Sequence, residues 1–186
     1  MKQRVMEAAK EEIIESGLRF TMRDLAARLG VSTKTIYQCF DSKEQIIDEI
    51  VTNSILEMKN SEASIMKDTR LTNLGKLKKT LVNLPEWFML SDIRLLKEFK
   101  QRYPKQWAEI DKLVTLGWNQ VQVLVEQAVQ EGVLRTFNLD LFIQMYIGCL
   151  YQLMENRYDR RAAQVPLEQV LDQMVELLLH GIALKE

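Results

Sequence analysis

Apolar residues recur at helical spacing along most of the chain, and short polar turns separate the segments that they mark. The first segment covers residues 2–16 and ends at Gly17, and another begins behind Thr21 and ends at Gly30. A glycine that can adopt a left-handed conformation often ends a helix, and a hydroxyl residue often caps the start of one. No alternating run of β-branched residues stands out. The pattern therefore predicts an all-α protein.

Two of these helical patterns lie back to back near the N-terminus. Gly30 ends the first one, and Ser32 caps a short second helix whose Ile36 and Phe40 face inward. Ser42 then caps a long third helix. A helix, a tight turn through glycine and a short helix with a polar outer face are typical of a helix-turn-helix, whose second helix enters the major groove of DNA.

Two motifs cover this stretch: Thr21-x-Arg23-Asp24-Leu25-Ala26 and Leu29-Gly30-Val31-Ser32-x-x-x-Ile36-Tyr37-x-x-Phe40-x-Ser42-Lys43-Glu44. They resemble the N-terminal domain of TetR-family transcriptional regulators, and the resemblance is dense over residues 3–50. One departure is Cys39, which stands where family members often carry histidine, at a position usually peripheral to DNA contact. The resemblance implies a three-helix DNA-binding domain over residues 1–48 and a helical effector-binding and dimerisation domain over residues 49–186.

The candidate DNA contacts are polar or basic residues on or beside the second helix of this motif. Thr and Gln can read base edges, Lys can contact guanine or phosphate, and hydroxyls and helix N-termini suit phosphates. The resemblance implies that Tyr37 presses on the DNA backbone and that Lys43 contacts a phosphate. Alternatively, these are ordinary surface residues of a small helical domain. The set is Thr21, Arg23, Arg28, Ser32, Thr33, Lys34, Thr35, Tyr37, Gln38 and Lys43.

The charge distribution supports DNA binding better than the total charge does. The net charge of −1 at first argues against a nucleic-acid partner. Between residues 19 and 43, however, the sequence holds five basic residues and two acidic ones, whereas acids gather in the first helix. We expect a local basic face with a modest DNA affinity per subunit, and dimerisation would double the number of contacts.

Further helices follow this motif. One long helix should run to about residue 65, and its polar second half, from residue 59 to residue 70, is interpreted as a solvated connection without a partner. A helical pattern from residue 71 stops at Pro85, and another precedes Pro104. The pattern from residue 105 to residue 131 predicts one long helix.

The last two predicted helices, over about residues 139–157 and 166–183, are apolar nearly all the way round. A helix of this kind must be buried on all sides. A second copy of the same two helices would supply the missing partner, in a four-helix interface about a two-fold axis. TetR-like proteins dimerise in this way. The alternative is burial within the core of a larger monomer.

Aromatic residues gather in the second half of the chain, together with several methionines. At helical spacing they are more often core than pocket, but the resemblance implies an effector cavity among these helices. Aromatic and Met side chains would suit an apolar or cationic aromatic ligand. Glu98 and Glu155 are the acids that fall within apolar stripes. The candidate ligand contacts are Trp87, Phe99, Tyr103, Trp107, Trp118, Phe142 and Tyr146.

The sequence offers few residues for catalysis or metal binding. His180 is the one histidine and falls in an apolar stripe, and Cys39 and Cys149 lie far apart, so no four-ligand zinc site is expected. Cys39 lies in the helix predicted to contact DNA, so a redox role for it stays open. The simpler interpretation is an inert thiol. We expect no enzyme, no cofactor, no membrane span and a reducing cytoplasmic location.

These observations lead to one expected function and one alternative. The expected protein is a ligand-responsive homodimer that binds a near-palindromic operator in double-stranded DNA. A small hydrophobic effector would release it, as the resemblance implies. The alternative is an architectural or partner-recruiting DNA-binding factor without an effector. The sequence does not identify the effector, the operator or the regulated genes.

Overall fold

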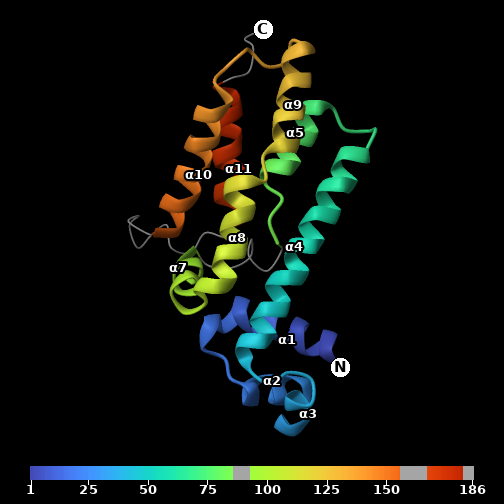
Figure 1. The fold of residues 1–186 in the computed structure, drawn as a ribbon, viewed down its shortest axis with the longest axis vertical. Coiled ribbons are helices and arrows are strands. Elements are labelled where there is room, and N and C mark those ends of the chain that lie inside the picture. Colours follow the sequence, from blue (N-terminus) through green and yellow to red (C-terminus); the bar gives the residue numbers. More distant parts are fainter. Residues whose placement is uncertain (86–92, 156–166, 182–186) are drawn as a thin grey trace.

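The computed structural model describes residues 1–85, 93–155 and 167–181, and every regular element within these ranges is a helix (Figure 1). The prediction of an all-α fold is therefore confirmed. The helices form an elongated molecule, with the N-terminal helices at one end. In the described ranges, no helix combines the length and apolar character that crossing a bilayer requires.

The N-terminal end of the molecule is a small cluster of helices, which we call the head. It contains the predicted helix, turn and short helix, and the first turns of a long helix complete its core. Its elements are α1 (Lys2–Ser16), the 3₁₀ turn η1 (Gly17–Arg19), α2 (Met22–Leu29) and α3 (Thr33–Tyr37), followed by the long α4 (Lys43–Lys67).

Local hydrogen bonds explain where the head helices begin and end. The Thr21 backbone N–H donates to Asp24 Oδ2 (2.7 Å), and the Asp24 backbone N–H donates to Thr21 Oγ1 (3.3 Å), which forms a capping box at the start of α2. Gly30 ends α2 with a φ of 65°, in the left-handed region that glycine adopts without strain. Ser32 and Ser42 cap α3 and α4. The caps expected from the sequence are thus formed.

The remaining helices form the body of the molecule. In Figure 1, α4 rises from the head along one side of the body, and α5 lies beside α9 near the top. Helix α10 packs against α7 and α11, and α4 packs against α5 and α8. The body helices are α5 (Asn73–Leu81), α7 (Ile93–Arg102), α8 (Pro104–Leu116), α9 (Asn119–Gln130), α10 (Leu139–Glu155) and α11 (Leu167–His180).

The single long helix expected over residues 105–131 is wrong, because α8 and α9 are separate helices that break at Gly117. A Cβ atom at Gly117 would lie 2.8 Å from the Leu113 carbonyl oxygen, so this tight break requires glycine. The Val114 carbonyl oxygen accepts a hydrogen bond from the Trp118 indole Nε1 (2.8 Å). A side-chain donor therefore stabilises the break and fixes the position of Trp118.

The head and the body are joined by α4 and by contacts of α7 with η1. Gly17 has a φ of 71°, and a Cβ atom there would lie 3.6 Å from Leu95 Cδ1 of α7. Gln106 Nε2 in α8 donates to Asp48 Oδ1 in α4 at 3.3 Å. The boundary expected between residues 48 and 49 falls inside α4, so one continuous helix carries structure from the head into the body.

Candidate DNA-reading surface and effector cavity

The outer face of α3 presents four of the predicted DNA contacts to solvent. Thr33, Lys34, Tyr37 and Gln38 are exposed, and Tyr37 keeps 53% of its accessible surface. Ile36, on the opposite face, is fully buried. Packing on one side and polar exposure on the other let this helix present its side chains to a groove.

Ser32 and Thr35 interact with each other at the start of α3. The Thr35 backbone N–H donates to Ser32 Oγ (3.2 Å), and the two hydroxyl oxygens lie 2.9 Å apart in a hydrogen bond. Thr35 is half-buried. Within this structure, Ser32 therefore caps α3, and the Thr35 hydroxyl is paired with the cap.

Thr21 is engaged in the same way at the start of α2. Its hydroxyl donates to Asp24 Oδ2 (2.8 Å), and this hydrogen bond with Thr21 keeps the pKa of the Asp24 carboxyl below its usual range. The Thr21 hydroxyl therefore already donates its hydrogen bond to Asp24, so it has no free donor for a phosphate. A carboxylate also stands beside the first turn of α2.

Arg28 lies among three carboxylates of α1 rather than pointing freely to solvent. Its Nε donates to Glu12 Oε1 (2.7 Å), its Nη1 donates to Glu11 Oε2 (3.1 Å), and its Nη2 pairs with Glu15. The hydrogen bond with Arg28 lowers the pKa of Glu15, and the glutamates raise the pKa of Arg28. In this structure Arg28 therefore ties α2 to α1, and its contact with a phosphate stays a prediction.

Lys43 points into the head, toward the end of η1. Its Nζ donates to the carbonyl oxygens of Leu18 and Phe20, at 2.6 Å each, and lies 3.9 Å from the centre of the Phe20 ring. Burial, and next the charge of Arg102, lower the pKa of Lys43. The ammonium group is occupied by these carbonyls, so a phosphate contact would require it to leave them.

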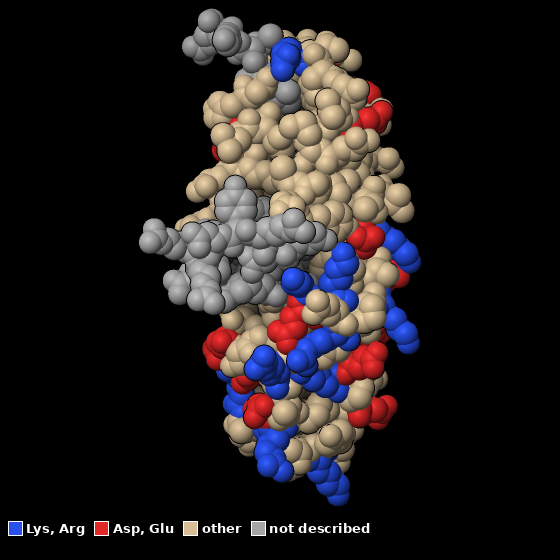
Figure 2. All heavy atoms as spheres, turned by 90° about the vertical axis from the view of Figure 1, so that its left-hand side faces the viewer, with Lys and Arg blue, Asp and Glu red and all other residues tan. Residues whose placement is uncertain are grey.

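Three basic residues between η1 and α3 remain open to solvent. Arg19, Arg23 and Lys34 are exposed, and none of them forms an ion pair with another described residue. Figure 2 shows lysine and arginine atoms reaching the tip of the head, where charges of both signs are dense. These three cations are available for phosphates, together with the exposed Arg4 of α1.

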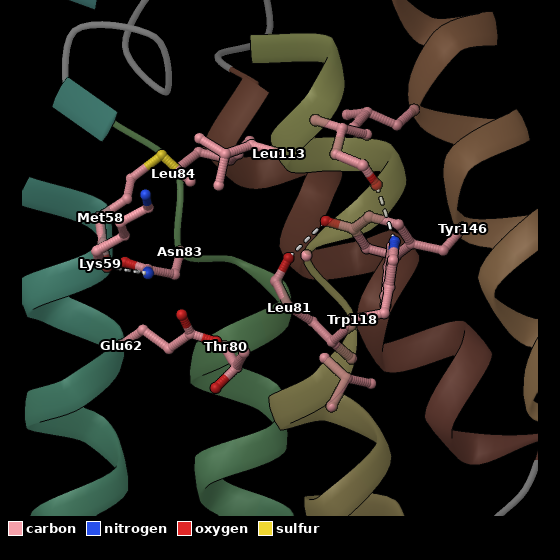
Figure 3. A pocket seen from close by; sticks show the side chains of 14 residues that line it. Met58, Lys59, Glu62, Thr80, Leu81, Asn83, Leu84, Leu113, Trp118 and Tyr146 are labelled. Carbon is pink, nitrogen blue, oxygen red and sulfur yellow. Dashed lines mark hydrogen bonds between the residues drawn. The ribbon is translucent and has the colours of Figure 1, made fainter. Parts of the chain in front are cut away.

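The body contains a cavity of about 90 Å³ between α4, α5, α8, α9 and α10 (Figure 3). Most of its wall is apolar, and a smaller second cavity of about 20 Å³ lies next to it. Met58, Leu84, Leu113 and Val114 line both spaces, so movement of these side chains would join them. The first cavity is lined by Met58, Lys59, Glu62, Thr80, Leu81, Asn83, Leu84, Leu113, Val114, Gly117, Trp118, Val121, Tyr146 and Leu150.

Several polar groups in this wall are paired within the protein. Tyr146 Oη donates to the Leu81 carbonyl oxygen (2.5 Å), and Asn83 Nδ2 donates to the Met58 carbonyl oxygen (3.0 Å). Burial raises the pKa of the Tyr146 hydroxyl, so this hydroxyl keeps its proton. The Trp118 and Tyr146 rings meet edge to face with centres 5.1 Å apart. These bonds hold the aromatic wall in a fixed position.

Two other polar groups in the wall are not paired. Thr80 Oγ1 is buried and has no hydrogen-bond partner among the described residues. The Glu62 carboxylate reaches from α4 toward α5, where Thr80 lies (Figure 3), and the described residues supply it with no hydrogen bond or ion pair. Burial is the one cause that raises the pKa of Glu62. The cavity therefore holds a carboxylate and a hydroxyl that a bound molecule could satisfy.

Comparison with known proteins places this geometry in a family. Residues 5–50 match the family described as bacterial regulatory proteins, tetR family. A Bacillus subtilis protein described as the uncharacterized HTH-type transcriptional regulator YvaF is 34% identical over 186 residues, which covers 100% of this chain and 97% of that protein. The chain belongs to the TetR family. It is accordingly a DNA-binding transcriptional regulator, as the sequence motifs predicted.

Solved structures of transcriptional regulators share the fold at low sequence identity. A TetR/AcrR-family transcriptional regulator from Thermobifida fusca is 21% identical, with a TM-score of 0.65 and 97% coverage of both chains. The transcriptional regulator FadR from Bacillus subtilis, solved in complex with stearoyl-CoA, is 20% identical, with a TM-score of 0.59 and coverage of 98% of this chain and 100% of FadR. These likenesses support the arrangement of the helices over the whole chain.

The aromatic residues predicted to bind a ligand in this TetR-family body do not all lie together. Trp118 and Tyr146 line the cavity. Phe99 is buried and packs against Tyr103, with ring centres 5.5 Å apart, and Phe142 packs against Phe137. Trp107 is buried in α8, and neither it nor these other rings line the cavity. Trp87 lies outside the described residues.

The acids singled out in the sequence do not line the cavity either. Glu98 pairs with Arg102 (2.8 Å), and the Glu155 side chain lies outside the described residues. Glu62, which does line the cavity, falls in the polar second half of α4 that the sequence analysis assigned to solvent. Glu62 in α4 faces Thr80 in α5, and the residues next to Glu62 in the sequence do not indicate this orientation. The packing of α4 against α5 decides which polar residue faces inward.

One face of α10 carries exposed apolar residues at helical spacing. Leu141 and Met145 keep 53% and 49% of their accessible surface, and Gly148 and Cys149 continue the same face. Leu177 of the neighbouring α11 keeps 76%. Figure 2 shows that the upper part of the molecule, where α10 lies, has few charged atoms compared with the head. The sequence-predicted interface helices therefore leave an uncharged, partly apolar face uncovered.

Proposed function

We propose that this TetR-family protein is a homodimeric repressor that a small effector releases from its operator by occupying the cavity between α4 and α10. The observation that carries the proposal is the cavity itself, with an apolar wall and with a buried hydroxyl and a carboxylate that no described residue pairs. Buried polar groups are normally hydrogen-bonded. A cavity that leaves a buried hydroxyl and a partly buried carboxylate open suits a ligand that completes them.

Operator binding would use the exposed face of α3. Thr33 and Gln38 would reach base edges, Tyr37 would press on the backbone, and Lys34 would contact guanine or phosphate. Arg19 and Arg23 would add phosphate contacts beside α3. In a dimer, two such helices would enter successive major grooves of a near-palindromic site.

Dimerisation would bury the uncharged face of α10 against the same face of a second copy, with α11 beside it. Replacing Met145 by Glu would place a charge in the centre of that interface. The variant should be a monomer in analytical ultracentrifugation and bind an operator fragment more weakly. Leu116→Glu is the matched control, because Leu116 is an exposed apolar residue of α8, away from this face. A Met145→Glu dimer would contradict this interface.

Effector binding would reach DNA through α4. Its N-terminal turn belongs to the head, and its Met58 and Glu62 line the cavity. A ligand that prefers one position of α4 would bias the spacing of the two α3 helices. The coupling is reciprocal, so operator DNA should weaken ligand binding by the same factor.

The test starts from an operator fragment selected from random DNA by the purified protein. Apolar, amine-bearing and acyl-type compounds are screened for an increase in melting temperature, and each hit is added to the DNA-binding assay. A compound that stabilises the protein and weakens operator binding supports the proposal. If compounds that occupy the cavity leave operator affinity unchanged, the protein is a DNA-binding factor without an effector response.

A further inference from the structure

We propose that the effector is a small apolar molecule bearing a protonated amine, whose N–H groups bind the Glu62 carboxylate and the Thr80 hydroxyl. This inference rests on the proposed function, since it assigns a chemical class to the ligand of the same cavity.

Glu62 provides the charge selectivity. The carboxylate lies in the cavity wall between α4 and α5 and has no ion pair with a described residue. Lys59 is the other charged residue of the lining, and it is exposed to solvent. A ligand cation would therefore meet an uncompensated carboxylate, whereas a ligand anion would bring a second negative charge into a partly desolvated site.

Thr80 provides a second polar contact. Its Oγ1 is buried and unpaired, and Figure 3 shows it on the side of the cavity toward which Glu62 extends. An ammonium group has several N–H donors and no acceptor, so it can bond to a carboxylate and a hydroxyl at the same time. An alcohol has one O–H donor and can satisfy one of these two acceptors by donation. The geometry thus favours the amine over an alcohol of the same length.

The rest of the cavity favours a short apolar body. Leu81, Leu113, Val121 and Leu150 supply aliphatic walls, and the Trp118 and Tyr146 rings are locked by their own hydrogen bonds. The two neighbouring spaces measure about 90 and 20 Å³. Rotation of the flexible Met58 side chain would merge them and make room for a chain of a few carbons.

The experiment compares n-hexylamine, 1-hexanol and hexanoate by isothermal titration calorimetry on the full-length protein. These probes share a six-carbon body and differ in the charge of the head group. A charge-assisted hydrogen bond should give hexylamine about a tenfold or greater advantage in affinity over hexanol. Hexanoate should bind most weakly. Equal or tighter binding of hexanol or hexanoate would overturn the inference.

Variants then locate the amine. Glu62→Gln keeps the shape of the side chain and should remove the advantage of hexylamine over hexanol, whereas Glu57→Gln, on the exposed face of the same helix, should keep it. Thr80→Val should weaken hexylamine, and Thr80→Ser should restore its affinity. Unchanged hexylamine affinity in Glu62→Gln would also overturn the inference.

These experiments distinguish failure of the amine inference from failure of the proposed repressor function. If hexanol binds as well as hexylamine and both weaken operator binding, the amine inference fails while the effector-controlled repressor stands. If hexylamine does not bind, the amine inference fails. The repressor proposal fails as well only when no compound of the wider screen changes operator affinity.

Discussion

The head and the cavity treat their polar side chains in opposite ways. In the head, Arg28 is paired with three glutamates and Lys43 with two carbonyl oxygens. In the cavity, neither Thr80 Oγ1 nor the Glu62 carboxylate pairs with a described residue. The head must hold α3 in one geometry, so it gains from polar side chains that are paired within the protein. A binding site instead leaves polar groups unpaired for its ligand. The head is thus a preassembled DNA-reading surface, whereas the cavity wall has polar groups that a bound molecule would complete.

The largest expected effect comes from removing the core under the reading surface. Phe40 is 1% exposed in the head, and Phe40→Ala should lower the free energy of unfolding by about 3–5 kcal/mol because it leaves a cavity. Urea unfolding followed by circular dichroism measures the change. Phe40→Leu, which keeps more of the volume, should lose less. An unchanged unfolding midpoint for Phe40→Ala would mean that the head is not held by this core.

The next effect separates DNA binding from stability. Lys34 is exposed on α3, so Lys34→Ala should weaken operator binding by about tenfold while leaving the unfolding free energy within about 0.5 kcal/mol. Fluorescence anisotropy with a labelled operator measures the affinity. Lys112→Ala removes an exposed lysine of α8 and should leave DNA affinity unchanged. Equal losses in the two variants would argue against α3 as the reading helix.

A smaller effect tests whether Thr21 acts as a cap or as a phosphate contact. Thr21→Ala removes the acceptor of the Asp24 backbone N–H and should cost about 1 kcal/mol of stability. Thr21→Ser keeps the hydroxyl and should recover most of it. The measurement is a thermal unfolding curve together with an operator titration. A loss of DNA affinity with full stability would assign the hydroxyl to phosphate instead.

The smallest effect concerns the charge of Glu62. Burial raises its pKa in the folded protein, so the folded state holds this proton to higher pH than the unfolded chain does. Stability contributed by the protonated form is present at acid pH and is lost as pH rises through the raised pKa. At neutral pH, Glu62→Gln should therefore have a slightly higher melting temperature than the unsubstituted protein. Near pH 4, the two proteins should have the same melting temperature. A lower melting temperature at neutral pH would contradict an unpaired carboxylate.

Much of the head could be predicted because its determinants are local. Thr21, Ser32 and Ser42 cap helices through residues three positions later, and Gly30 ends α2 through its own φ angle. Sequence spacing contains all of this information. The roles of Arg28 and Lys43 could not be read in the same way, because their partners lie 13 to 25 residues away. A basic residue in a motif looks the same whether it faces DNA or a neighbouring helix.

The cavity was predicted only in part. Its aromatic character was expected, and Trp118 and Tyr146 do line it. Their position depends on the break at Gly117, which the periodicity of residues 105–131 concealed, because α8 and α9 both continue the same apolar spacing. Glu62 was missed since a charged residue in a polar segment is normally solvated. The packing of α5 against α4 reverses that expectation.

The break between α8 and α9 also gives the protein an optical property. The Trp118 indole is held by Val114, meets the Tyr146 ring edge-on and forms part of the cavity wall. Its emission depends on the polarity and mobility of this wall. A ligand entering the cavity would replace solvent at the ring and change the tryptophan spectrum. The chain thus carries its own fluorophore at the site, so cavity occupancy can be followed without a label and in the presence of DNA.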